Sequence, residues 1–96
     1  MICTLTARRL KPGSYDAFRS AWDPGAVPTG WTRIYHCRDA SDADVVLSFG
    51  LFDGTLEELR NAQGRLGRDE QVNRIDPHVQ KVLLDGAYEV IEELHP

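Results

Sequence analysis

The stretch that decides the fold is VVLSFGLF at Val45–Phe52, followed by DG at residues 53–54 and by TLEE at Thr55–Glu58. The nearly continuous apolar run predicts a strand, and the scarcity of polar residues predicts that both faces of its sheet are covered. TLEE is the pattern of a capping box, in which the first hydroxyl and the last carboxylate each accept a backbone hydrogen bond. A buried strand that turns directly into a helix is therefore predicted here.

Two strands and a helix are predicted before this stretch. Ile2–Leu10 mixes β-branched and apolar residues, and the KPG that follows it breaks a strand. Tyr15, Phe18 and Trp22 recur at helical spacing, which predicts a helix over Ser14–Trp22 with Ser14 as its cap. The remaining predictions are a loop at 23–30, which holds two prolines and two glycines, an alternating strand at Trp31–Cys37, and a hairpin connection at 38–44.

After Val45–Phe52, the sequence predicts a broken helix and a last strand. Leu56, Leu59 and Leu66 share one apolar stripe, which Gly64 and Gly67 interrupt. Asp69 is then expected to cap a second helical piece that reaches Ile75 and stops at Pro77. Val79–Leu94 is predicted as an extended strand with a bulge or bend at Gly86.

Composition bounds the class of protein. The 96 residues suit one domain spanning 1–96, with 42% apolar and 27% charged residues. The net charge is −4 and the eleven basic residues are scattered, which argues against nucleic acid as a partner. No segment has the length of apolar sequence that a membrane span needs, and Met1–Leu10 lacks the apolar run of an export signal. A cytoplasmic protein that does not bind membranes is expected.

Metal and cofactor motifs are not found. Cys3 and Cys37 are expected to be reduced, because no export signal is found, and to pack in the core, as free cysteines usually do. No CxxC spacing accompanies them, so a metal site at this pair is not expected. GxGxxG, P-loop, HExxH and GxSxG patterns do not occur. No cofactor and no metal are predicted.

The order strand, helix, strand, strand, helix, strand describes the ferredoxin-like α+β plan, βαββαβ with a four-stranded antiparallel sheet. With Val45–Phe52 running into DGTLEEL and the closing segments PHV (77–79) and GAYEV (86–90), the chain resembles the dimeric α/β-barrel superfamily. The small antibiotic-biosynthesis-monooxygenase-like proteins are the group it resembles most. The resemblance covers nearly the whole chain and rests on element order and length.

This resemblance implies a homodimer in which two sheets face each other to form a barrel, with a small cleft between sheet and helices in each subunit. Proteins of this group include cofactor-independent oxygenases of aromatic polyketides, quinol oxygenases and haem-degrading enzymes. A small aromatic ligand is therefore expected as a partner. The resemblance does not choose among these activities.

Two aromatic residues and a cation are predicted to share one side of the strand Trp31–Cys37. Alternation places Trp31, Arg33 and Tyr35 together, where they would stack on and orient a flat phenolic substrate. Ordinary cross-strand packing with an edge arginine explains the same pattern.

Histidines are the candidate general bases. His36 points to the other side of that strand, and His78 lies at the start of the last strand, where it is expected to border the cleft. A packed or partly exposed histidine is the alternative for each, and His95 lies in the tail. Asn73 is a further ligand-binding candidate, but a haem site is not predicted, because Asn73 and His78 are five positions apart with Pro77 between them.

Two function classes remain open at this point. The first is a monooxygenase-like enzyme that acts on aromatic or quinol substrates, with an isomerase or a small lyase as a variant. The second is a non-catalytic dimeric binding or regulatory module, which predicts a closed or wholly apolar cleft.

Overall fold

A computed structural model describes residues 1–27 and 29–96; Pro28, part of the predicted 23–30 loop, lies outside the described residues. The elements are β1 (Ile2–Leu10), α1 (Tyr15–Trp22), β2 (Trp31–Arg38), β3 (Val45–Phe52), α2 (Leu56–Leu66), α3 (Arg68–Ile75), the short 3₁₀ helix η1 (Asp76–His78) and β4 (Val79–Glu89). They form a four-stranded antiparallel sheet in the order β2-β3-β1-β4. The predicted ferredoxin-like α+β fold is confirmed.

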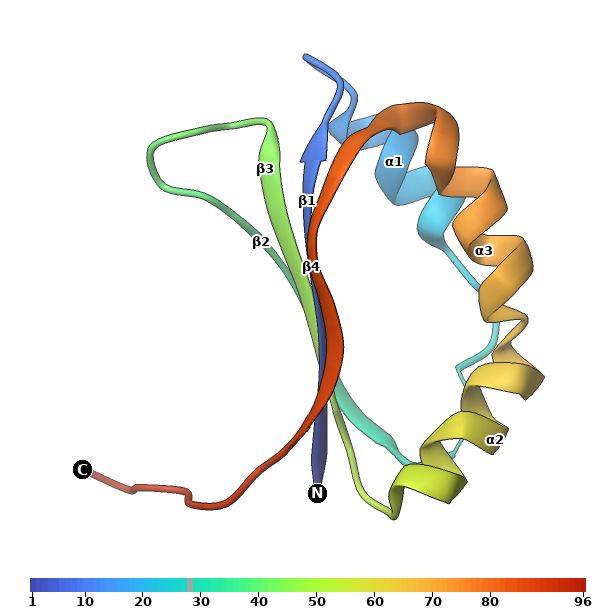
Figure 1. Ribbon diagram of the computed structural model, residues 1–96, viewed down its shortest axis with the longest axis vertical. Coiled ribbons are helices and arrows are strands. Elements are labelled where there is room, and N and C mark those ends of the chain that lie inside the picture. Colours follow the sequence, from blue (N-terminus) through green and yellow to red (C-terminus); the bar gives the residue numbers. More distant parts are fainter. Residues whose placement is uncertain (28) are drawn as a thin grey trace.

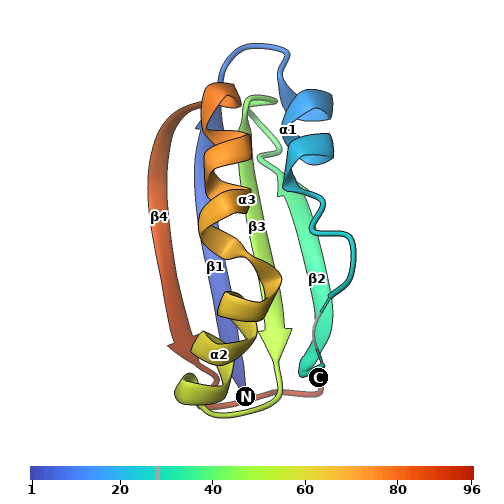
Figure 2. The same ribbon diagram turned by 90° about the vertical axis from the view of Figure 1, so that its right-hand side faces the viewer.

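All helices lie on one face of the sheet, and the other face is open (Figures 1 and 2). Burial along β3 alternates strictly: Val46, Ser48, Gly50 and Phe52 are buried beneath the helices, while the residues between them are half-buried. Within one chain the helices cover only one face of this strand, so cover on the other face stays a prediction. Its apolar residues fill the helix face and line the open face.

The predicted helix caps are found in the structure at one helix but not at another. The capping box is confirmed, since the Thr55 hydroxyl accepts from the Glu58 amide and the Glu58 carboxylate accepts from the Thr55 amide, both at 3.1 Å. Gly67 adopts φ 75° and ends α2, so that α3 begins at Arg68. Ser14 makes no side-chain capping bond to α1, contrary to the prediction.

The last strand is shorter and more irregular than predicted. β4 ends at Glu89 rather than Leu94, and residues 90–96 run away from the sheet on its open side (Figure 1). Gly86 pairs in register with Leu5, so the predicted bulge does not occur at Gly86. The register shifts instead occur where β4 passes Arg8 and Leu10 of β1.

Two apolar clusters hold the helices on the sheet at opposite ends. One consists of Ile2, Phe52, Leu59 and Ala62, and the other of Leu10, Phe18, Val46 and Ile75. On the helix face of β1, positions 2 and 10 belong to these clusters, and the three positions between them are Thr4, Thr6 and Arg8. The middle of the helix face is therefore polar.

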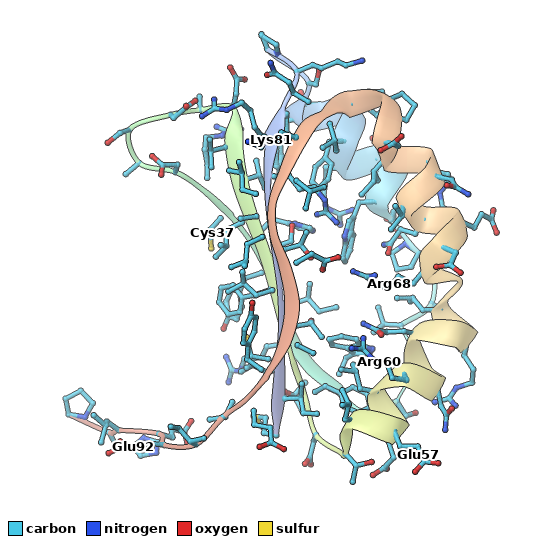
Figure 3. All side chains as sticks on the ribbon, in the orientation of Figure 1. Cys37, Glu57, Arg60, Arg68, Lys81 and Glu92 are labelled. Atoms are coloured by element: carbon cyan, nitrogen blue, oxygen red, sulfur yellow. The ribbon has the colours of Figure 1, made fainter. Side chains whose placement is uncertain are left out.

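Free cysteines lie on the open face, not in the core. Cys3 pairs with Leu51 and Cys37 with Leu47, which places both side chains on the face without helices. Figure 3 shows Cys37 on this side. Cys3 is half-buried and Cys37 is exposed, and neither belongs to the buried core, so the prediction that both pack in the core is wrong. Within residues 1–27 and 29–96, no helix is both long and apolar enough to cross a membrane.

Candidate functional site

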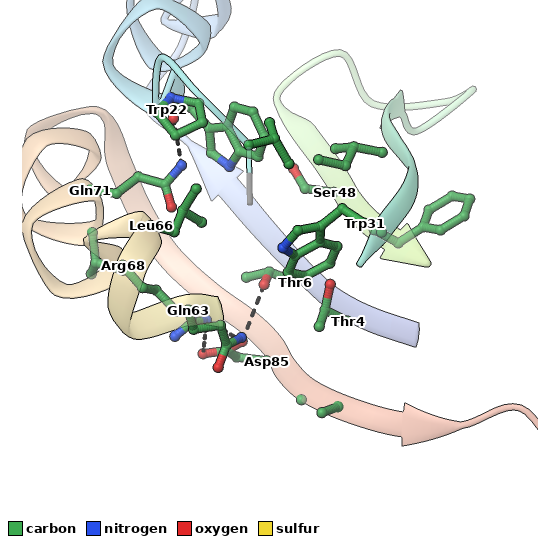
Figure 4. Close-up of a pocket in the computed structure, with 18 of the residues that line it drawn as sticks. Thr4, Thr6, Trp22, Trp31, Ser48, Gln63, Leu66, Arg68, Gln71 and Asp85 are labelled. Carbon is green, nitrogen blue, oxygen red and sulfur yellow. Dashed lines mark hydrogen bonds and ion pairs between the residues drawn. The ribbon is translucent and has the colours of Figure 1, made fainter. Parts of the chain in front are cut away.

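A cavity of about 180 Å³ lies between the two apolar clusters, under the helices (Figure 4). Its floor is the polar middle of the sheet, and its walls come from α2, α3 and the segment after α1. The residues that line it include Thr4, Thr6, Arg8, Trp22, Trp31, Ser48, Gly50, Arg60, Gln63, Leu66, Arg68, Gln71 and Asp85.

Trp31 forms one wall of this cavity because of a bulge in β2. The register shifts between Trp31 and Arg33, so Thr32 is the extra residue and Trp31 turns to the helix face. There its ring lies against Gly50, where an added Cβ would come within 2.7 Å of it. The predicted grouping of Trp31 with Arg33 and Tyr35 on one side is therefore wrong.

Two helix side chains fix the opposite wall. Gln71, which is 6% exposed, donates from Nε2 to the Trp22 carbonyl, and Arg74 donates from Nε to the Ala21 carbonyl at 3.1 Å. These carbonyls belong to the last turn of α1, where they have no partner inside the helix. α3 thereby holds Trp22 against the cavity (Figure 4).

An ion pair closes the cavity near the sheet edge. Arg68 on α3 donates to both carboxylate oxygens of Asp85 on β4, at 3.0 and 3.2 Å. The Thr6 hydroxyl donates to the same carboxylate at 3.1 Å. Arg68 and Arg60 both lie between the helices and the sheet (Figure 3).

His36 lies on the helix face of β2 beside the cavity and reaches the cavity floor through Ser48. Its Nδ1 is 2.8 Å from the Ser48 hydroxyl oxygen, and its Nε2 is buried without a hydrogen-bond partner among the described residues. Trp22 packs edge-on against the imidazole with a centroid distance of 4.5 Å. Burial lowers the pKa of His36, and the charges of Arg19 and Arg8 lower it further. The imidazole is therefore neutral at pH 7 and able to accept a proton.

This lowered pKa predicts an acid-dependent loss of stability. The unfolded chain binds a proton at His36 below its ordinary pKa of 6.5, whereas the folded chain does so only at lower pH. The free energy of unfolding is thus expected to fall as pH drops from 6.5 towards the lowered pKa, and to level off below it. Urea titrations between pH 7.5 and 5 measure this slope.

His36→Gln is the matched variant for that experiment, since it cannot titrate. We expect its free energy of unfolding to be flat over the same pH range. Asp42 also has a lowered pKa, because Arg9 and the Asp44 amide donate hydrogen bonds to its carboxylate. Its effect on the free energy of unfolding falls near and below its ordinary pKa of 3.8, outside the range of this experiment. An equal slope in the variant and the natural chain would contradict the assignment to His36.

The other predicted site residues lie outside the cavity lining. Arg33 and Tyr35 are exposed on the open face, where Arg33 Nη1 approaches the Tyr35 hydroxyl at 3.4 Å. Asn73 is exposed on α3. His78 ends η1 at the far end of the sheet, where its carbonyl accepts from the Lys11 amide at 3.0 Å. Of the residues predicted, the structure brings Trp31 to the cavity and His36 next to it.

Sequence reasoning missed most of the polar lining: Arg8, Ser48, Arg68, Gln71 and Asp85. One signal was available, because Thr4, Thr6 and Arg8 occupy alternate positions between two core residues of β1. The described residues contain no cluster of three or more His, Cys, Asp or Glu side chains able to hold a metal ion.

Comparison with known proteins gives structural neighbours only. No family model matches the sequence, and no curated protein matches it. Among solved structures, it is similar to a "putative antibiotic biosynthesis monooxygenase" from Chloroflexus aurantiacus J-10-fl, with TM-score 0.77 and 13% identity over 98% of this chain and 96% of that one.

Two further solved structures are similar to this chain. A protein from Nitrosomonas europaea, also named as a putative antibiotic biosynthesis monooxygenase, has TM-score 0.76 and 12% identity over 96% of this chain and 100% of that one. An uncharacterized NIPSNAP domain protein from Burkholderia xenovorans has TM-score 0.70 and 18% identity over 100% and 99%. The chain therefore has the ferredoxin-like fold of the antibiotic-biosynthesis-monooxygenase-like structures, as its sequence predicted.

Proposed function

We propose that the cavity binds a one-ring aromatic molecule and that the protein oxygenates it as a cofactor-independent monooxygenase. The observation that supports this is the convergence of polar side chains on a cavity walled by Trp22 and Trp31. A few placed polar groups among apolar walls are the usual composition of a small-molecule site. The fold shared with the monooxygenase-like structures is compatible with this activity but does not select it.

The size of the cavity favours one ring. A cavity of about 150 Å³ is known to accept benzene, and this one measures about 180 Å³. A phenol or quinol with small substituents fits that space, whereas a polycyclic polyketide would extend out of it. The proposed substrates are therefore single-ring phenols and quinols.

The pair of Ser48 and His36 supplies a path for the substrate's proton. A phenol at the floor donates to the Ser48 oxygen, and the serine proton passes to His36 Nδ1 across 2.8 Å. The resulting phenolate has carbanion character on its ring and adds molecular oxygen there. Loss of water then leaves a quinone, so that one oxygen atom stays on the ring, the other leaves as water, and the substrate supplies the electrons.

The polar lining argues against the non-catalytic alternative. A purely structural or regulatory dimer was expected to have a closed or wholly apolar cleft, whereas this cavity contains charged side chains, hydroxyls and amides. An isomerase would use the same proton path without oxygen. Oxygen uptake therefore separates the oxygenase from both alternatives.

The test is oxygen consumption with single-ring quinols, measured with an electrode against buffer without protein. His36→Gln is expected to lower the rate by about 100-fold or more, the usual contribution of general base catalysis. His78→Gln, the same change outside the cavity, is expected to leave the rate unchanged. In the natural chain the rate should hold through pH 6.5 and fall only as the pH approaches the lowered pKa of His36.

Two outcomes would contradict the oxygenase. One is uptake no greater than in buffer alone with every quinol tested. The other is an equal loss in the His36 and His78 variants, which would mean that neither histidine acts through the cavity.

We also propose that a second copy of the chain covers the open face. That face carries Leu5, Leu47, Phe49 and Leu51 on its central strands and Leu84 and Tyr88, 47% and 45% exposed, on β4. A contiguous apolar surface of this kind is typical of an interface. The cytoplasmic location expected from the sequence stays a prediction.

A further inference from the structure

Arg8 is a buried cation that forms no ion pair with any described residue. It lies on the helix face of β1, is 6% exposed and lines the cavity. Its Nη1 is buried and has no hydrogen-bond partner among residues 1–27 and 29–96. A buried charged donor left unpaired is costly, so an arginine in this state is typical of a site that a ligand completes.

The acid whose charge acts on Arg8 is Asp85, and its carboxylate is already hydrogen-bonded to other residues. Asp85 acts on Arg8 through its charge, but both of its carboxylate oxygens accept bonds from Arg68, and one accepts from Thr6. The guanidinium of Arg8 also packs on the Phe18 ring, with its central carbon 5.4 Å from the ring centroid. The protein therefore holds the Arg8 charge in place without neutralising it.

A second orphan donor belongs to the same cavity. The indole Nε1 of Trp31 is buried and has no acceptor among the described residues, and the Trp31 ring is one wall of the cavity (Figure 4). Arg8 is in register with Val46 and Trp31 with Phe52, so the two donors reach the cavity from opposite ends. They call for a ligand with an acceptor atom at each end. A carboxylate at the Arg8 end supplies an acceptor and the negative charge that would pair with Arg8.

The charge of the whole lining favours the same ligand. Three arginines, Arg8, Arg60 and Arg68, line the cavity together with one aspartate, Asp85, which leaves a net charge of plus two there. The chain as a whole has a net charge of −4. The positive charge is thus concentrated at the cavity of an acidic protein, and it would draw an anion to that place.

We infer that the ligand of this cavity is a one-ring aromatic carboxylate whose carboxylate binds Arg8 Nη1 and whose ring carries a second acceptor atom for Trp31 Nε1. The inference rests on the proposed function in that it names the substrate class of the same site. The hydroxyl that reacts would be a second substituent of the ring, next to Ser48.

The test is a binding comparison between charged and neutral probes of equal shape. Benzoate and 4-hydroxybenzoate are titrated into the protein beside benzamide and 4-hydroxybenzamide, followed by calorimetry and by the fluorescence of Trp22 and Trp31, both of which line the cavity. We expect each carboxylate to bind at least about tenfold more tightly than its amide.

Arg8→Met removes the charge and keeps most of the side-chain length. It is expected to weaken benzoate binding at least about 30-fold, while benzamide binding changes little. The ligand-free variant should unfold at the same or a higher temperature than the natural chain, because an unpaired buried charge has been replaced by an apolar group. Arg65→Met, the same change at an exposed residue of α2, should leave both affinities unchanged.

Equal binding of benzoate and benzamide, no binding of either at millimolar concentration, or full benzoate binding by a folded Arg8→Met variant would overturn the inference. Oxygen uptake is scored separately. Carboxylate-selective binding without oxygen uptake refutes the oxygenase and leaves the ligand class standing. Oxygen uptake with neutral quinols but without a preference for carboxylates would support the oxygenase and refute the proposed ligand class.

Discussion

Leu47→Asp is expected to separate the proposed dimer into monomers. Leu47 lies on β3, a central strand of the sheet, in register with Ala7 on one side and Cys37 on the other. In a two-fold interface each substitution occurs twice, and a carboxylate buried there without a partner costs several kcal/mol. The dissociation constant should rise by at least about 100-fold, which corresponds to about 3 kcal/mol.

Light scattering at micromolar concentration measures this change. The control is Leu56→Asp, which introduces the same charge at a leucine that is 51% exposed at the start of α2, on the side of the molecule that carries the helices. That variant should keep the mass of the natural chain. A natural chain that is already a monomer under these conditions would refute the dimer.

Phe18→Ala is expected to lower the free energy of unfolding by about 3 to 5 kcal/mol. The ring is fully buried, and it packs with Leu10, Val46 and Ile75 in the cluster that fixes α1 and α3 to the sheet. A domain of this size has only about 5 to 15 kcal/mol in total. Guanidinium denaturation at one fixed protein concentration gives the difference.

Phe18→Leu is the graded comparison, because it leaves a smaller cavity and should cost less. The two variants also report on the site, since the Phe18 ring supports Arg8 on one side and lies 6.1 Å from the His36 ring on another. A loss below about 1 kcal/mol in Phe18→Ala would mean that the cluster repacks around the gap.

The fold was predictable because its signals are local. The capping box at Thr55–Glu58, the turn residues and the apolar run at Val45–Phe52 each depend on neighbours in sequence, and they fix the order of the elements. The same locality also limits what the apolar run can tell. An apolar run reports that its residues avoid water, but it does not say whether helices or a second molecule provide the cover.

The site was harder to predict because it is assembled across the chain. Asp85 meets Arg68 over 17 positions, and Gln71 reaches the Trp22 carbonyl over 49. No spacing rule links such residues before the helices are placed on the sheet. Arg8 was the detectable exception, because a charged residue on the helix-facing side of a strand between two core positions needs an explanation.

The bulge at Thr32 affects how this chain must be aligned with others of its fold. Because β2 contains one extra residue, the odd-numbered residue before it, Trp31, faces the helices, whereas the odd-numbered residues after it, Arg33 and Tyr35, face the open side. An ungapped alignment through β2 would match Trp31 with residues of the outer face, and the aromatic wall would then look variable across proteins. Placing a gap at Thr32 restores the correspondence, so inherited binding residues in this strand are best sought by superposition.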